Sequence, residues 1–170
     1  MNNTSRTETI SGTFTMNKKR LALLGVAALM ALGLAAQNDS TLFMQQLCAL
    51  EGISDVKPLE TSTFKEKYVL KMEQQVDWKT LSKGTLKERI IIGMKGLNKP
   101  TIIVTEGYFA NYGISPDYEE ELSRLFDANV ILCEYRYFAE SVPQPTNWDY
   151  MTVDNSLADY HHVRQTMGQL

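Results

Sequence analysis

Two short, continuous apolar runs constrain the fold of this chain most strongly. They are TIIVT at 101–105 and VILCEY at 130–135. In neither run do apolar and polar residues alternate, as they do in a strand with one face exposed to solvent. Such runs are typical of strands covered on both faces, as in parallel sheets. The intervening SPDYEEELSRLFDAN predicts a helix, because Ser115 is a good cap, Pro116 suits the first helical position and acidic residues follow. Strand, helix and strand at this spacing predict a parallel, right-handed crossover.

The apolar spacing also predicts which faces of the helices are buried. The helix after Ser115 is expected to bury Tyr118, Leu122, Leu125 and Phe126. A helix at about 152–167, capped by Thr152, is expected to turn inward Val153, Leu157, Tyr160 and Met167. A short helix is predicted in TLFMQQLCAL at 41–50, because Gly52 can end it.

A change of period upstream predicts an antiparallel hairpin. In the first run Tyr68, Leu70 and Met72 alternate with charged residues, namely Lys67, Lys71 and Glu73. The run LKERIIIGM alternates in the same way through Leu86, Ile90, Ile92 and Met94. The two runs are joined by the Gly-bearing loop VDWKTLSKGT, which is typical of a hairpin. A hairpin followed by parallel strands with crossover helices is an α/β arrangement.

The N-terminal region predicts export. The basic patch Met16-Asn17-Lys18-Lys19-Arg20 precedes the apolar run LALLGVAALMALGLAA, so a signal peptide is predicted over 16–36. Residues 1–15 are interpreted as a mis-called extension, with Met16 as the true start and 37–170 as the exported part. The protein is then secreted or periplasmic, with no stable membrane span after cleavage near Ala35 or Ala36. An uncleaved anchor is the alternative, since a spanning helix needs only about 20 apolar residues.

Composition excludes several classes of function. The formal net charge of −3 arises from 17 basic and 20 acidic side chains, which gives no basic field for nucleic acid. The sequence has neither zinc-ligand spacing nor a phosphate-binding glycine loop, so no metal and no cofactor are expected. Its two cysteines, Cys48 and Cys133, do not form a disulfide framework.

One motif carries a family resemblance. Glu134-Tyr135-Arg136-Tyr137 ends the second apolar run and leads into the turn Glu140-Ser141-Val142-Pro143. Together with VTEGYFANYGISPDY upstream, this segment resembles the secreted bacterial serine tripeptidyl aminopeptidases and, more distantly, the prolyl carboxypeptidase and dipeptidyl peptidase group. A Tyr stands at 135, where those families usually have His. The resemblance spans roughly 40–167. It implies the N-terminal part of an α/β-hydrolase that acts on peptide substrates.

The nucleophile of such a hydrolase is missing from this sequence. It belongs on a tight G-x-S-x-G turn, and the Gly-Ile-Ser stretches ending at Ser54 and Ser115 both lack the second Gly. His161 and His162 are neighbours on a predicted helix, so they point about 100° apart. No catalytic residue is therefore expected in this chain, which we interpret as truncated before the nucleophile and inactive alone. A secreted, non-catalytic binding or structural module is the alternative. Truncation is also expected to expose the main chain of the strand at 130–135.

The resemblance implies candidate site residues in the loop after the strand at 101–105. In this fold that loop supplies one backbone N–H of the oxyanion hole, and Gly107 and Tyr108 are the candidates. Glu106 could pair with the free amino terminus of a peptide substrate, or it could be structural.

The resemblance also places the motif after the second apolar run beside the site. There a buried polar brace is expected from Glu134, Arg136, Tyr137 and Glu140. The alternative is a solvated loop after an edge strand. The brace is favoured because the preceding run is apolar throughout.

Overall fold

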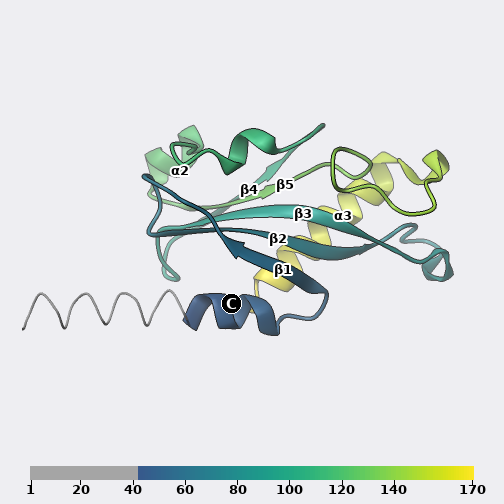
Figure 1. Cartoon of the computed structure of the whole chain (residues 1–170), viewed down its shortest axis with the longest axis horizontal. Coiled ribbons are helices and arrows are strands. Elements are labelled where there is room, and N and C mark those ends of the chain that lie inside the picture. Colours follow the sequence, from purple (N-terminus) through teal and green to yellow (C-terminus); the bar gives the residue numbers. More distant parts are fainter. Residues whose placement is uncertain (1–41) are drawn as a thin grey trace, which may run out of the picture. The chain divides into compact units, whose positions relative to one another are not determined.

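A mixed five-stranded sheet carries the fold, in the order β1-β2-β3-β5-β4 (Figure 1). Its strands are β1 (Ile53–Pro58), β2 (Glu66–Gln75), β3 (Thr85–Met94), β4 (Thr101–Thr105) and β5 (Asn129–Cys133). The computed structural model describes residues 42–170, so the predicted extension at 1–15 and signal peptide over 16–36 lie outside the described residues. The predicted α/β class is confirmed, since helices pack on this sheet.

Strands β2 and β3 form the predicted antiparallel hairpin, with a continuous register from Glu66 opposite Met94 to Gln75 opposite Thr85. The predicted inner faces are buried, including Tyr68, Leu70 and Met72. One residue that was expected on the solvent-exposed face is not exposed. Lys67 is buried, because its ammonium group donates to the carbonyl oxygen of Ser115 at 2.7 Å and lies over the Tyr118 ring.

Strand β1 was not predicted. It pairs antiparallel with β2, and its register shifts between Ser54 and Lys57. The left-handed backbone of Asp55, with φ 55°, falls within this irregularity. A bulge of this kind breaks the period-two pattern that sequence reasoning relies on. Ser54 therefore lies in an edge strand, opposite Lys71.

Strands β4 and β5 pair in parallel, as predicted from the two apolar runs. Strand β5 also pairs antiparallel with β3, and all five of its residues are buried. The expectation that this strand would have an exposed main chain is therefore wrong. The open edge next to it belongs to β4, whose central residues Ile102, Ile103 and Val104 are only partly buried.

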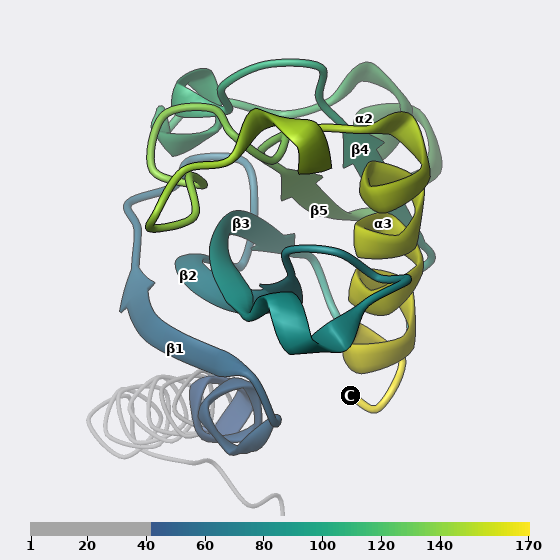
Figure 2. The ribbon, with the colours of Figure 1, turned by 90° about the vertical axis from the view of Figure 1, so that its right-hand side faces the viewer.

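Helix α3 (Val153–Met167) begins where predicted, with the Thr152 side chain accepting a hydrogen bond from the Asn155 N–H at 3.2 Å. Figure 2 shows α3 lying alongside the sheet. Its predicted inner face is wrong in the first half, because Val153 and Leu157 are 68% and 61% exposed. The buried positions are instead mainly polar at this end: Asn155, Ser156 and Asp159, followed by Val163, Thr166 and Met167.

Helix α2 (Glu121–Phe126) is much shorter than predicted. The segment before it forms tertiary hydrogen bonds in place of helical ones: the carbonyl oxygen of Pro116 accepts from the Ser62 N–H, and that of Tyr118 from the Thr63 hydroxyl. The face of α2 that packs on the protein also differs from the predicted face. Its buried residue is Ser123, whereas three residues of the expected stripe are exposed: Leu122, Leu125 and Phe126.

Apolar side chains cover both faces of the sheet. On one face the helix at 42–49, with Phe43 and Leu47, packs with α3 over β2, β3 and β5. On the other face a smaller cluster comprises Phe64, Ile91, Ala110, Val130 and Leu132. The short 3₁₀ helix Asn111–Ile114 lies so close to this face that a Cβ at its buried Gly113 would approach Leu132 Cδ2 to 2.3 Å. Gly113 is thus required for packing.

Among residues 42–170, no helix is long and apolar enough to cross a membrane.

Candidate functional site

The loops after β4 and β5 lie at the same end of the sheet, because the two strands are parallel neighbours. Two backbone hydrogen bonds join the loops beyond the strand ends. The Glu106 N–H donates to the Cys133 carbonyl oxygen at 3.4 Å, and the Tyr135 N–H donates to that of Tyr108 at 3.0 Å. The motif at 134–137 is therefore held directly beside the loop that contains the oxyanion-hole candidates.

Gly107 and Tyr108 have exposed backbones in this loop. Within the described part of the chain, neither N–H donates to an acceptor. A Cβ at Gly107 would meet no atom within 4 Å, so the space beside this residue is open. Two free donors at an open position can bind an anionic or carbonyl oxygen.

Glu106 is half-buried, and hydrogen bonds hold both its side chain and its main chain. Its carboxylate accepts a hydrogen bond from the Tyr112 hydroxyl, and its carbonyl oxygen accepts one from the Tyr160 hydroxyl at 2.9 Å. Burial raises the pKa of Tyr112, and the bond to Glu106 raises it further, so the phenol keeps its proton and donates it. The second carboxylate oxygen of Glu106 accepts no hydrogen bond from the described residues.

Glu134 is fully buried and accepts hydrogen bonds at both carboxylate oxygens. One oxygen pairs with Arg89 and accepts the Ala110 N–H at 3.2 Å. The other accepts from the Ser141 hydroxyl at 2.8 Å and from the Glu140 N–H at 3.3 Å. This network ties β3, the loop after β4 and the turn at 140–143 to the end of β5.

Arg136 belongs to a separate network. Its guanidinium forms a two-point ion pair with Asp159 of α3, with Nε to Oδ2 at 2.6 Å and Nη2 to Oδ1 at 2.8 Å. The remaining N–H groups donate to three carbonyl oxygens at 2.9–3.0 Å, those of Gln75, Val76 and Tyr150. All five donors of this buried cation are thus paired.

The remaining members of the expected brace lie apart from Arg136. Tyr137 is buried, and its hydroxyl donates to the Asn147 carbonyl oxygen at 2.6 Å. Glu140 is exposed and pairs with Lys71 at 2.8 Å. The hydrogen bond from Lys71 lowers the pKa of the Glu140 carboxyl. The structure therefore contains two buried ion-pair networks where sequence reasoning expected one brace of neighbouring residues.

A third buried acid, Glu88, is influenced by the charges of both networks, those of Asp159, Arg136 and Glu134. Glu88 of β3 is 1% exposed; one carboxylate oxygen accepts from the Gln74 amide at 2.7 Å and the other has no partner among the described residues. Burial, followed by the charge of Asp159, raises the pKa of Glu88 well above its ordinary value. The same burial raises the pKa of the Cys133 thiol.

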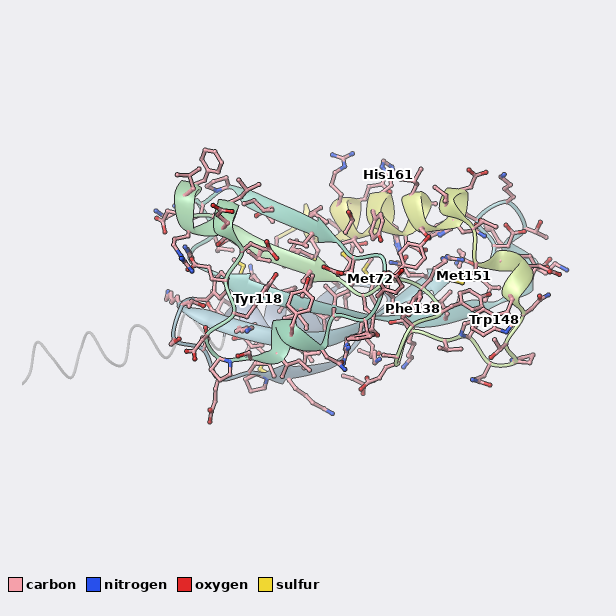
Figure 3. The ribbon with its side chains drawn as sticks, turned by 90° about the horizontal axis from the view of Figure 1, so that it is seen from above. Met72, Tyr118, Phe138, Trp148, Met151 and His161 are labelled. Atoms are coloured by element: carbon pink, nitrogen blue, oxygen red, sulfur yellow. The ribbon has the colours of Figure 1, made fainter. Side chains whose placement is uncertain are left out.

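The serines and histidines form no catalytic arrangement within residues 42–170. The Ser54 hydroxyl accepts from Lys87 at 3.1 Å, and neither Ser54 nor Ser115 has a hydrogen bond to a histidine among these residues. His161 lies on the outer side of α3 (Figure 3). His162 is less exposed than a surface pair would require, because its Nδ1 contacts Gln74 Oε1 at 2.8 Å. In the same range, no group of three or more acidic, His or Cys side chains could hold a metal ion.

Sequence reasoning missed Arg89 and Asp159, which neutralise the two buried charges of the motif. A signal existed for Arg89, because three consecutive charged residues, Lys87, Glu88 and Arg89, stand directly before the apolar run Ile90–Ile92 of the same strand, and two of them in a row cannot both face solvent. Charged residues inside a buried strand are expected to be paired. Asp159 carried no such signal, since an acidic residue in a helix is ordinarily solvated.

Comparison with known proteins places this geometry in context. The family model described as PS-10 peptidase S37 matches residues 38–170. The prolyl tri/tetrapeptidyl aminopeptidase of Streptomyces mobaraensis is 32% identical over 99 residues, which is 58% of this chain and 20% of that protein. The matched part of the chain thus spans about a fifth of the length of this curated relative.

Proposed function

The chain belongs to the PS-10 peptidase S37 family, and from this we propose that it is the N-terminal part of a secreted serine aminopeptidase. The complete enzyme would remove short peptides from the N-termini of its substrates. Its fold would be that of an α/β-hydrolase, with 16–36 as a cleaved signal peptide and 37–170 as the start of the peptidase domain. The relative from Streptomyces mobaraensis is named as an aminopeptidase, which supports this class of substrate.

The free N–H groups of Gly107 and Tyr108 carry this proposal. They lie in the loop after a parallel strand, where an α/β-hydrolase supplies one donor of its oxyanion hole. One such donor contributes about 10²–10³ in turnover when a nucleophile is beside it. The paired network around Glu134 supports the same role, because it fixes the loop on which the donors lie.

Glu106 would bind the free amino terminus of the substrate. Its carboxylate is half-buried and has an oxygen that accepts nothing from the described residues, so an ammonium group could pair with it. A partly desolvated carboxylate binds a cation more strongly than a fully solvated one. An aminopeptidase needs such a group to select free N-termini.

The acyl transfer itself would use a Ser, His and acid outside these 170 residues, because the sequence holds no G-x-S-x-G turn. The chain alone would then be inactive. The test compares two proteins: this chain, and the product of its reading frame extended through the DNA downstream of Leu170. Each is incubated with a fluorophosphonate probe and a chromogenic tripeptide substrate.

We expect labelling and hydrolysis only in the extended product. Labelling of Ser54 or Ser115 in this chain would contradict the assignment of both serines as non-catalytic. An unrelated downstream sequence after a true stop would favour the other candidate, a secreted binding module. One observation favours that candidate: β5 is already paired on both sides within this chain, so the sheet centre needs no further strand.

A further inference from the structure

Three neighbouring strands each contribute a cation to one cleft on the sheet. Lys57 of β1, Lys71 of β2 and Arg89 of β3 line this cleft, which has a volume of about 150 Å³. The three strands lie side by side in the sheet (Figure 1). Lys71 and Arg89 are direct partners in the register of β2 and β3, and like charges at such positions repel one another. We call this site the basic cleft.

The Arg89 side chain is 4% exposed, yet most of its donors have no partner. Its Nη2 donates to Asn111 Oδ1 and to Glu134 Oε1. Its Nε is buried and donates to no acceptor within residues 42–170. Its Nη1 lies 3.8 Å from Glu140 Oε1, which is too far for a hydrogen bond. Since Nε carries one N–H and Nη1 carries two, three of the five N–H groups are unpaired in the described part of the chain.

A second buried arginine shows how a guanidinium with a structural role is paired. Arg136 uses all five of its donors, on Asp159 and on three carbonyl oxygens. Buried donors without partners are rare in native proteins. The free donors of Arg89 therefore indicate a ligand that accepts hydrogen bonds, and a guanidinium binds such a ligand most strongly when it is negatively charged.

The charges around the basic cleft favour an anion over a cation. Glu140 pairs with Lys71 at 2.8 Å, and Asp55, the other acid that lines the cleft, lies 4.0 Å from Lys87. Lys57 is exposed and forms neither a hydrogen bond nor an ion pair with the described residues. Each acid is thus matched by a cation, and Lys57 remains in excess.

We propose that the basic cleft binds a small oxyanion, a phosphate or a carboxylate group. The anion accepts a hydrogen bond from a free N–H group of Arg89 and is attracted by the excess charge of Lys57. A cavity of about 150 Å³ accommodates a benzene-sized group, and these anions are no larger. The inference does not depend on the proposed peptidase activity.

Glu140 is the competitor of such an anion. Its carboxylate is 61% exposed, and one of its oxygens already lies 3.8 Å from Arg89 Nη1. A bound anion would take the position toward which this carboxylate points. Removing the charge of Glu140 should therefore favour binding, whereas a cleft that is merely structural would gain nothing from the change.

The test titrates sodium phosphate and sodium acetate, separately, into the chain and follows the side-chain Nε–H signal of Arg89 by NMR. Sodium chloride at the same ionic strength is the reference, because it reports charge screening alone. Arg89 stays intact, since its loss would leave buried Glu134 without a counter-ion. The variants are Lys57→Gln and Glu140→Gln, which both change exposed side chains. Lys83→Gln is the matched control, because Lys83 is an exposed lysine that does not line the cleft.

The Arg89 signal should shift and saturate with at least one of the two anions. Saturation with phosphate alone would assign the site to inorganic phosphate, and saturation with acetate alone would assign it to a carboxylate group. Lys57→Gln should weaken binding about two- to fivefold, the scale of one exposed ion pair, and Glu140→Gln should strengthen it by a similar factor.

Three results would overturn the proposal. The first is no saturation with either anion, and the second is an equal shift with chloride. The third is a loss of affinity in Lys83→Gln as large as that in Lys57→Gln, because the effect would then reflect the overall charge of the chain.

Discussion

Arg136 and Asp159 form a buried, two-point ion pair that joins the loop after β5 to helix α3. The guanidinium also donates to main-chain carbonyl oxygens of the β2–β3 loop region and of the segment before α3. One side chain therefore joins the end of β2 and the region around the start of α3, which are more than 70 residues apart in sequence, to the loop after β5. Burying this pair costs desolvation, so its main role is to hold these segments in a single arrangement.

Removing the charge of Asp159 should be strongly destabilising. Asp159→Asn leaves the buried guanidinium of Arg136 without its counter-ion, and breaking a buried pair in this way costs about 3–5 kcal/mol in the free energy of unfolding. Urea denaturation of the chain followed by circular dichroism measures the loss. The control is Asp154→Asn on the same helix, which breaks the exposed pair with Lys79. An equally large loss in the control would show that the effect is not specific to the buried pair.

Glu88→Gln should stabilise the chain near neutral pH. The folded-state pKa of Glu88 is raised by burial, so the folded state binds the proton more tightly than the unfolded state. This group's stabilising contribution is full below its ordinary pKa and is lost as the pH rises through the folded-state pKa. Facing charges are Asp159, Arg136 and Glu134.

The neutral amide of the Glu88→Gln variant should remove this loss. It should add on the order of 1 kcal/mol at pH 7, the scale of an unsatisfied buried polar group. Thermal melts of both proteins between pH 4 and 8 should diverge as the pH rises. Parallel melting curves across that range would contradict the assignment.

Gly113→Ala should destabilise the packing of the 3₁₀ helix Asn111–Ile114 on the face of the sheet. The new methyl group would lie 2.3 Å from Leu132 Cδ2 and 3.0 Å from Ile91 Cδ1, and overpacking of this kind costs about 1–3 kcal/mol. Gly107→Ala is the matched control, because its methyl group meets no atom within 4 Å. Chemical denaturation should separate the two variants. Equal stability would mean that this 3₁₀ helix moves away from the sheet at little cost in free energy.

The amides of β5 should exchange slowly with solvent. This strand is hydrogen-bonded to β3 on one side and to β4 on the other, and each of its residues is buried. Alternate amides of β4 face the open edge and should exchange at least roughly tenfold faster. Hydrogen exchange followed by NMR or mass spectrometry resolves Val130–Cys133 from Thr101–Thr105. Fast exchange throughout β5 would show that the sheet does not form in this chain.

Local sequence patterns predicted the helices and strands whose formation depends on neighbouring residues. The alternation from Tyr68 to Met72 predicted the hairpin, and Thr152 predicted the start of α3, because each depends on neighbouring residues alone. Strand β1 escaped prediction because its bulge disrupts the alternation between Ser54 and Lys57. The helix expected after Ser115 was shortened because Ser62 and Thr63, more than 50 residues away, occupy its carbonyl oxygens.

For the candidate site, the sequence by itself determined which residues gather after the two parallel strands, since Glu106, Gly107 and the motif at 134–137 directly follow apolar runs. Only the tertiary structure decided how their charges pair. Glu134 bonds to Arg89 of β3 and Arg136 to Asp159 of α3, rather than to each other. The physical reason is that a buried charge pairs with whichever opposite charge the packing of distant elements brings within hydrogen-bond distance. Periodicity carries no information about that distance.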